Sequence, residues 1–275
     1  MLRKCLHAIG MLALVAVTAT AQKPRPASAV PIDTLTMDAH LRFLASDLLE
    51  GRAPATRGGR LATEYIADQF RALGLEPAGS NGSYFQPVAL VGMTPQPTLD
   101  FGYRDSRDSL SYRDDFVAWA ERPDSDIAAS GELVFVGYGI RAPEWQWDDY
   151  KAMDLHGKVL LMLVNDPGLV DSTVFLGKIL TYYGRWTYKL EEAARQGAAG
   201  AILVHTPESA TYPWEVVRGS WSVEQFKLDV ARSPTLAFAG WVTEGAARAA
   251  LAKAGLNLDS LSRAAARRDF RPVAT

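Results

Sequence analysis

An acidic pair, Glu191-Glu192, and a nearby histidine, His205, are the residues of this chain whose types and spacing could do chemistry. They lie in the stretch YKLEEAARQGAAGAILVH, residues 188–205. Zinc hydrolases use carboxylates and imidazoles as metal ligands and as proton carriers. The stretch therefore raises the question of whether it binds a metal or only supports the fold.

The spacing around the acidic pair favours a supporting helix. Apolar side chains recur at Trp186, Leu190 and Ala194, which predicts an amphipathic helix over residues 185–196 that ends at Gly197. Neighbouring helical residues diverge by about 100°, so two adjacent carboxylates rarely bind one metal ion. We expect both carboxylates to lie on the solvent face of this helix.

The histidines give no metal-binding pattern. His205 ends the apolar run of residues 200–205, which predicts a buried strand whose last side chain is hydrogen-bonded to a loop. The others are His7, His40 and His156, and none of the four belongs to an HExxH, HxH or HxD motif. We therefore expect no catalytic, cofactor-binding or metal-ligating residues in this chain.

A glycine motif offers a second possible site. Residues 134–142, VFVGYGIRA, contain GxGxxA directly after an apolar strand, but Pro143 and EWQWDDY follow without a helical period. A dinucleotide fingerprint needs a helix to begin at its glycines, so a loop is expected here. The chain contains no GxSxG, and the glycines near residues 168–178 lack P-loop spacing.

Aromatic residues are numerous between positions 145 and 221. Packing in the core is the expected role, and an aromatic groove for a peptide or a glycan is the alternative. The residues are Trp145, Trp147, Tyr150, Tyr182, Tyr183, Trp186, Trp214 and Trp221.

The first residues predict export. A basic start, an apolar run over residues 6–17 and the small residues of 19–21 are typical of a signal peptide, with an N-terminal membrane anchor as the alternative. Cys5 is the single cysteine, so the mature chain would contain no disulfide. A net charge of −2 without a basic cluster argues against nucleic acid as a partner. A periplasmic or extracellular location is expected.

Periodicity predicts an α/β protein. Apolar spacing predicts helices over residues 36–48 and 60–73, the second of which ends at Gly74. Further on, an apolar run at residues 159–164, the helix at 185–196 and the strand at 200–205 form a parallel crossover unit. Additional elements are expected as a strand within residues 233–240 and a helix at 244–253 that ends at Gly255.

Together, these segments resemble a known group of enzymes. Residues 41–88, with ASDLLEGR and LGLEPAG, resemble the opening segment of secreted bacterial zinc aminopeptidases of peptidase family M twenty-eight. Residues 131–168 and 188–205 resemble the protease-associated domain, a swivelling β-sandwich or barrel-like β/α domain, that is inserted in many of these enzymes. The resemblance implies this division: signal peptide 1–21, linker 22–33, N-terminal helices of an incomplete peptidase domain 34–87, protease-associated domain 88–258 and return segment 259–275.

The zinc ligands of that family have no counterparts in this chain. Members hydrolyse N-terminal peptide bonds with two zinc ions, which are held by an HxD-type motif, a bridging Asp, a Glu-Glu pair and further ligands. Glu191-Glu192 belongs instead to a helix of the inserted domain, so no cofactor is expected here, although the resemblance implies two zinc ions in a full-length form.

The resemblance thus implies a non-catalytic N-terminal portion of an exported aminopeptidase-like protein. Its inserted domain would shape access for a peptide or protein substrate, without nucleic acid and without a stable membrane span after signal cleavage. The alternative is a stand-alone exported module that binds proteins or peptides without catalysis.

Overall fold

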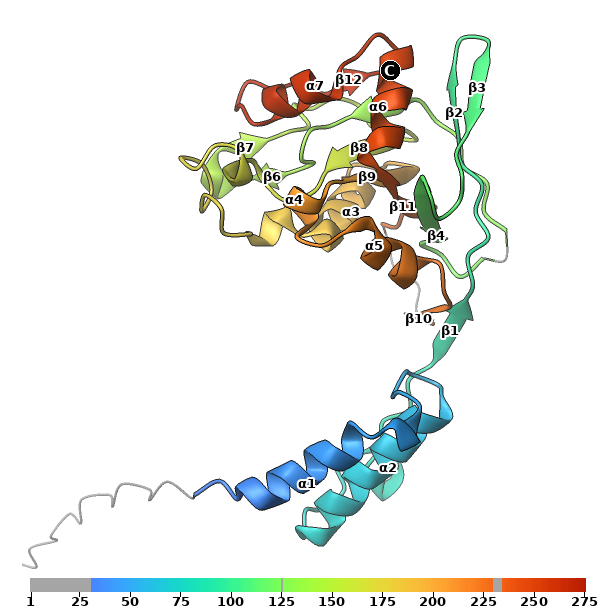
Figure 1. Ribbon diagram of the computed structural model, residues 1–275, viewed down its shortest axis with the longest axis vertical. Helices are drawn as coiled ribbons and strands as arrows, with labels where there is room; N and C mark the ends of the chain where they lie inside the picture. Colours follow the sequence, from blue (N-terminus) through green and yellow to red (C-terminus); the bar gives the residue numbers. More distant parts are fainter. Residues whose placement is uncertain (1–30, 125, 230–233) are drawn as a thin grey trace, which may run out of the picture. The chain divides into compact units, whose positions relative to one another are not determined.

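The computed structural model describes residues 31–124, 126–229 and 234–275 (Figure 1). The predicted signal peptide, residues 1–21, and most of the predicted linker lie outside the described residues. Contacts between Cα atoms divide the chain into two compact units, with the boundary between Pro77 and Ala78. Among the described residues, no helix is both long and apolar enough to cross a membrane.

The first unit contains two helices, α1 (Thr34–Leu44) and α2 (Arg57–Ala72). The Asp33 carboxylate caps α1 by accepting hydrogen bonds from the first backbone N–H groups, and Thr56 caps α2 in the same way. Gly74, with φ of 73°, follows α2 in the left-handed conformation that the sequence predicted for its end.

The predicted bounds of these helices were wrong at two points. The first helix ends at Leu44 instead of residue 48, because Ser46 caps a separate 3-10 turn, Asp47–Leu49. The second helix begins at Arg57 instead of residue 60, because the cap at Thr56 allows two glycines in its first turn. One of them, Gly58, lies so close to the Leu49 carbonyl that a Cβ atom there would overlap it.

The first unit buries few of its apolar side chains. Helix α1 contains no buried residue, and among residues 31–77 the buried apolar side chains are those of Leu49, Ala62 and Ala67. The His40 ring bonds to the Tyr65 hydroxyl, Nδ1 to Oη, at 2.8 Å. The large apolar side chains that remain exposed on the helices and turns are those of Leu35, Met37, Leu41, Phe43, Leu48, Leu61, Ile66, Phe70 and Leu73.

The second unit is built on a six-stranded mixed sheet with the order β12-β5-β8-β9-β11-β4. The neighbours β5, β8, β9 and β11 are parallel, and the strands at both edges are antiparallel to them. The strands are β4 (Phe116–Ala120), β5 (Leu133–Phe135), β8 (Val159–Leu163), β9 (Gly200–His205), β11 (Phe238–Thr243) and β12 (Val273–Ala274).

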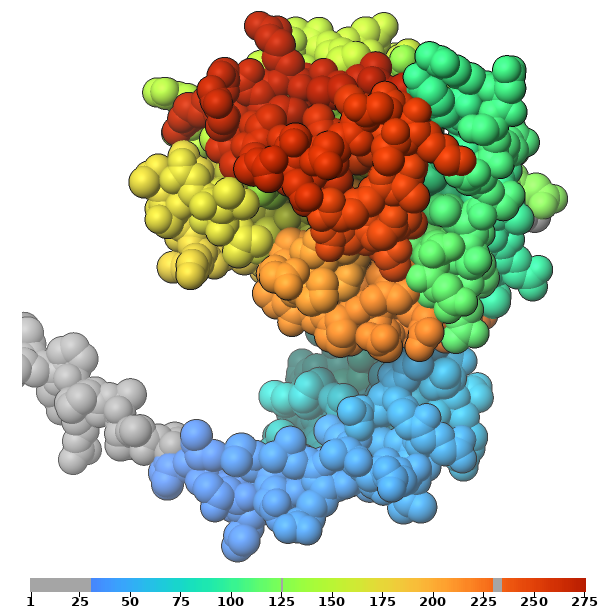
Figure 2. Space-filling model, turned by 45° about the horizontal axis from the view of Figure 1, so that its top comes forward, coloured from blue at the N-terminus to red at the C-terminus, as the bar shows by residue number. Residues whose placement is uncertain are grey.

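Helices cover both faces of this sheet. One face packs on α6 (Glu244–Lys253) and α7 (Leu258–Ala265), and the other packs on α3 (Trp186–Arg195) and α5 (Trp214–Trp221). Figure 2 shows α6 and α7 in red over one side of the unit. A short helix, α4 (Pro207–Ala210), follows β9. The central strands are largely apolar because both of their faces are buried, and the predicted α/β class is confirmed.

The predicted crossover unit is confirmed. Strands β8 and β9 are parallel with Val159 opposite Gly200, and α3 connects them. Strand β11 begins at Phe238, later than predicted, and it continues to Thr243, whose side chain then caps α6. Helix α6 has the predicted bounds, and Gly255 follows it with φ of 74°.

Three two-stranded ribbons flank the sheet. Their strands are β1 (Leu90–Met93) with β10 (Gln225–Leu228), β2 (Asp100–Tyr103) with β3 (Ser106–Ser109), and β6 (Arg141–Ala142) with β7 (Trp147–Asp148). Residues 259–275, the predicted return segment, supply most of α7 and all of β12, which pack on this same sheet.

Candidate functional site

The residues singled out from the sequence do not converge. His40 lies in the first unit beside Tyr65, whereas the His156 ring lies against Gly197 in the second. Glu191 and Glu192 belong to α3, and His205 ends β9. Within the described ranges, no three His, Cys, Asp or Glu side chains form a group that could hold a metal ion.

The prediction for the acidic pair was correct for Glu191 and wrong for Glu192. The Glu191 side chain is 58% exposed, whereas that of Glu192 is 7% exposed. The Glu192 carboxylate accepts hydrogen bonds from Arg195 Nε and from Gln196 Nε2, both at 2.7 Å. Two residues of the next turn therefore cover this carboxylate and supply its hydrogen bonds. The spacing of apolar residues along the helix did not reveal this cover.

We expect the two glutamates to respond differently to mutation. Glu191→Gln should change the free energy of unfolding by less than about 0.5 kcal/mol, as is usual at an exposed site. Glu192→Gln should lower it by about 1–3 kcal/mol, because an amide group would face the Arg195 guanidinium and leave a buried donor unmatched. Urea unfolding of both variants measures the difference. Equal midpoints would show that the buried contacts of Glu192 do not contribute to the free energy of unfolding.

His205 has the structural role that was predicted. Its ring is buried, and Nε2 donates to the carbonyl oxygen of Tyr212 at 3.0 Å. Trp214 and Trp241 contact the same ring. Burial lowers the pKa of His205, so the neutral ring is favoured. The imidazole fixes the loop after β9 and is not available as a ligand.

The GxGxxA stretch is a packed loop, as predicted. Gly137 and Gly139 have φ near 61° and 62°, and the ribbon strand β6 follows them instead of a helix. A Cβ atom on Gly139 would meet Met162 Sδ at 2.5 Å, and one on Gly137 would meet the Phe270 ring at 2.9 Å. The glycines serve close packing and do not form a phosphate cradle.

The sequence reasoning missed a buried charge cluster, which consists of Asp149, Asp166 and Lys189. All three side chains are buried, and each comes from a different segment beside the carboxyl ends of the parallel strands. Lys189, in the first turn of α3, donates from Nζ to the Tyr138 carbonyl at 2.5 Å. One signal in the sequence was available: Lys189 lies three residues after Trp186, on the apolar side of α3.

Asp149 connects the glycine loop to the β7 ribbon strand. Its carboxylate accepts from the Ile140 N–H at 2.9 Å and from Trp147 Nε1 at 2.8 Å. Burial raises the pKa of Asp149, and burial lowers the pKa of Lys189, while the attraction between the two charges opposes both shifts. The pair therefore stabilises a particular arrangement of loops at a cost in desolvation.

Asp166 closes a loop that contains residues 167–181, called here the 167–181 loop. Its carboxylate accepts from the Gly168 N–H at 3.0 Å at one end of the loop. At the other end it accepts from the Thr181 N–H at 3.2 Å and from the Thr181 hydroxyl at 2.6 Å. Compact loops whose ends are held together in this way often have functional roles.

Phe175 anchors the middle of the loop. Its ring is buried, stacks on Trp145 at 5.3 Å and meets the Trp147 ring edge-on at 5.3 Å. Phe175 has φ of 49°, which is uncommon for a bulky residue and costs about 1–3 kcal/mol. Gly168 lies against the Gly177 carbonyl, where any Cβ atom would overlap. Burial and close packing together hold the loop in this strained form.

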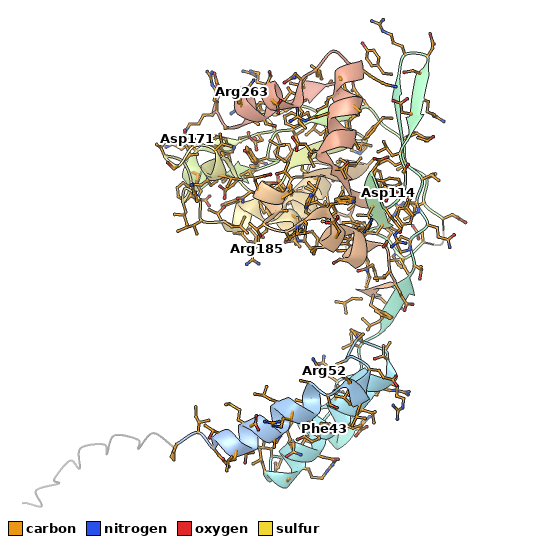
Figure 3. All side chains as sticks on the ribbon, viewed as in Figure 1. Phe43, Arg52, Asp114, Asp171, Arg185 and Arg263 are labelled. Atoms are coloured by element: carbon orange, nitrogen blue, oxygen red, sulfur yellow. The ribbon has the colours of Figure 1, made fainter. Side chains whose placement is uncertain are left out.

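The outer part of the loop presents apolar side chains to solvent. Leu176, Ile179 and Leu180 are 54%, 68% and 52% exposed, and these three residues are called the loop crest. Figure 3 shows Asp171 within the loop and Arg185 after it, both pointing outward. Contiguous exposed apolar groups mark contact sites on proteins. Because Lys189 is fully buried, the charge cluster supports the crest and does not reach a substrate.

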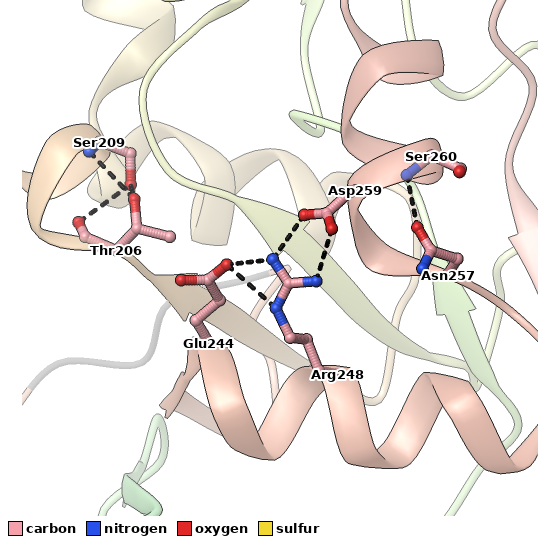
Figure 4. A network of polar contacts seen from close by, with 7 residues as sticks. All are labelled: Thr206, Ser209, Glu244, Arg248, Asn257, Asp259 and Ser260. Carbon is pink, nitrogen blue, oxygen red and sulfur yellow. Dashed lines mark hydrogen bonds and ion pairs between the residues drawn. The ribbon is translucent and has the colours of Figure 1, made fainter.

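A second polar network lies on the surface of the unit. Arg248 of α6 donates to Glu244 Oε1 at 2.6 Å and to Asp259 Oδ2 at 2.8 Å (Figure 4). These contacts connect α6 to α7 and raise the pKa of Arg248. The neighbouring Thr206–Ser209 and Asn257–Ser260 contacts are helix caps. The network fastens helices and offers no reactive group.

Comparisons with known proteins give a loose relation. No protein-family model matches the chain, and no curated protein matches it. Among solved structures, the chain is similar to an aminopeptidase from Aneurinibacillus sp. strain AM-1, with 21% sequence identity and a TM-score of 0.39. The match covers 82% of this chain and 42% of the aminopeptidase, so the chain spans less than half the length of that structure.

Proposed function

We propose that this chain is the N-terminal, non-catalytic portion of an exported zinc-dependent aminopeptidase-like protein. In this proposal, residues 34–87 supply peptidase-domain helices, and residues 88–258 are a protease-associated domain that shapes access for peptide substrates. The sequence resemblance over residues 41–88 and 131–168 motivates it. The chain itself would hold no zinc, and the two zinc ions would belong to the rest of the protein.

One observation carries the access role, namely the supported crest of the 167–181 loop. A loop that must contact passing substrates needs exposed apolar groups and a fixed position. The crest supplies the apolar groups, whereas Asp166 and Phe175 supply the fixed position. This geometry supports a contact role and offers no catalytic group.

The natural protein provides the test of the aminopeptidase proposal. It can be isolated from its own cells and culture medium with an antibody against this chain, and then sized by mass spectrometry. We expect a longer protein that releases N-terminal residues from aminoacyl p-nitroanilides and stops doing so when phenanthroline removes zinc. A product no longer than this chain, without peptidase activity, would instead support the stand-alone binding module.

If the loop crest contacts peptide substrates, a second result is expected for that natural enzyme. Leu176→Ser with Ile179→Ser should raise KM for peptides of several residues about tenfold, because apolar contact with the longer substrate is lost. KM for a single-residue anilide should not change. The exposed residues Val216 and Val223, changed to Ser, serve as the matched control. An unchanged KM for long peptides would mean that the loop crest does not contact the substrate.

A further inference from the structure

Strand β4 forms one edge of the six-stranded sheet, and its outer side is free beyond Phe116, whose carbonyl oxygen accepts from the Arg113 N–H at 2.7 Å. The N–H of Glu121, just after β4, donates to the Ala237 carbonyl at 3.1 Å. Backbone groups alternate in direction along an antiparallel strand, so Ala118 and Ala120 direct their N–H and C=O groups away from β11. Within the described part of the chain, no hydrogen bond occupies these outward groups.

A cleft of about 560 Å³ lies along this free edge. Ala118, Trp119 and Ala120 of β4 line it, and residues 91–99 form a further part of its wall. Figure 1 shows the chain between β1 and β2 running beside β4. The volume is within the range of known ligand sites, roughly 300–1,000 Å³. The unpaired strand edge therefore lies in a partly open cleft.

Two prolines explain why the neighbouring segment leaves β4 unpaired. Pro95 and Pro97 alternate with Thr94, Gln96 and Thr98 along this wall. The prolines are half-buried and the polar residues are exposed, which is the pattern of an extended segment. Because proline has no N–H to donate, this segment cannot complete a ladder with β4, although proline keeps its backbone extended.

We propose that the edge of β4 binds an extended peptide segment by strand addition. The peptide would exchange backbone hydrogen bonds with Ala118 and Ala120 inside the cleft, as in other β-augmentation complexes. Asp124 and Asp126 are the charged residues among those that line the cleft. Asp124 already pairs with Arg122 at 3.3 Å, so the basic side chain that the peptide should carry would face Asp126. This site is separate from the loop crest and does not depend on the aminopeptidase proposal.

A second copy of this chain fits the edge less well than a peptide does. In a symmetric dimer the β4 edges of both copies would have to meet, but each edge lies in a cleft lined by residues 91–99 and by Pro123, Asp124, Asp126, Ile127 and Ala129. Those flanking segments would collide before the two edges paired. A single extended strand avoids this collision, because it brings no flanking wall of its own.

The test uses the whole chain and the probe acetyl-Thr-Val-Lys-Val-Thr-Val-amide, with binding measured by calorimetry. Ala120→Pro removes one outward N–H and places the proline ring in the cleft, so we expect binding to weaken about tenfold or more. Ala120→Ser is the matched control, because it keeps the N–H, and its affinity should stay close to that of the unchanged chain. Thermal unfolding establishes that both variants fold.

The backbone of the probe gives an independent measurement that needs no variant. Two forms of the same peptide are made, each N-methylated at the alternate residues whose N–H groups point to one edge of the extended peptide. Each form cannot pair along its methylated edge, so at least one of the two forms should fail to bind. Hydrogen exchange at the amides of Ala118 and Ala120 should slow when the unmethylated probe is added. Equal binding of all forms, unchanged exchange at both amides, or self-association that the probe does not reduce would each overturn the proposal.

Discussion

Replacing Lys189 with methionine should lower the free energy of unfolding by about 3–5 kcal/mol, the usual cost of removing one partner from a buried group of charges. The change deletes the hydrogen bond to the Tyr138 carbonyl and leaves Asp149 and Asp166 buried without the attraction of the Lys189 charge. The methionine side chain fills a similar volume, so the lower free energy of unfolding results from the missing charge and not from a cavity. Urea unfolding, followed by circular dichroism, measures it.

Lys158 supplies the matched control for this experiment. Its ammonium group pairs with Glu132 at 2.6 Å, but the side chain is partly exposed. Lys158→Met should therefore cost no more than about 1 kcal/mol. Equal losses for the two variants would show that the cluster of Asp149, Asp166 and Lys189 contributes no more than a surface pair.

Brief treatment with trypsin should remove the first unit and leave the α/β unit largely whole. Helix α1 buries none of its residues, and much of the apolar surface of α2 is exposed, so local opening of both helices requires little energy. We expect early cleavage in the first unit, followed by a resistant fragment that begins at Ala72, because no lysine or arginine lies between Arg71 and Arg104. The expected sites are Arg52, Arg57, Arg60 and Arg71, all of which are exposed.

Mass spectrometry of timed samples identifies the sites and their order. The internal control is Lys158, which lies next to β8 in the same digest and should be cut late. Gel filtration before digestion establishes that the protein is monomeric, because association would shield the helices. Protection of the Arg52 and Arg60 sites equal to that of Lys158 in the monomer would mean that the first unit is stable by itself.

The central strands of the sheet were predictable because their signals are local, whereas the edge strands β4 and β12 were not predicted. The run at residues 159–164 is apolar throughout, the run at 200–205 is apolar up to His205, and the helix between them has a clear period. Gly74, Gly197 and Gly255 all take positive φ after helices, as the helix-ending pattern requires. Each of these predictions depended on neighbours within a few positions along the chain.

The buried charges were not predictable in the same way. Asp149, Asp166 and Lys189 are separated by many residues, and only Lys189, on the apolar side of its helix, differs in its own segment from an ordinary surface charge. Their burial is a property of the loops that fold over them, which one sequence does not encode locally. Glu192 shows the same limit at short range, since its cover depends on the rotamers of Arg195 and Gln196.

The closure of the 167–181 loop by Asp166 has a consequence for engineering. One carboxylate binds Gly168 and Thr181, so both ends of the loop are held in place beside the sheet. A foreign recognition sequence grafted in place of residues 176–180 would be displayed as a constrained hairpin-like insert. Its ends would already be joined by the scaffold, so most of the entropy of ordering it would be lost before any target arrived.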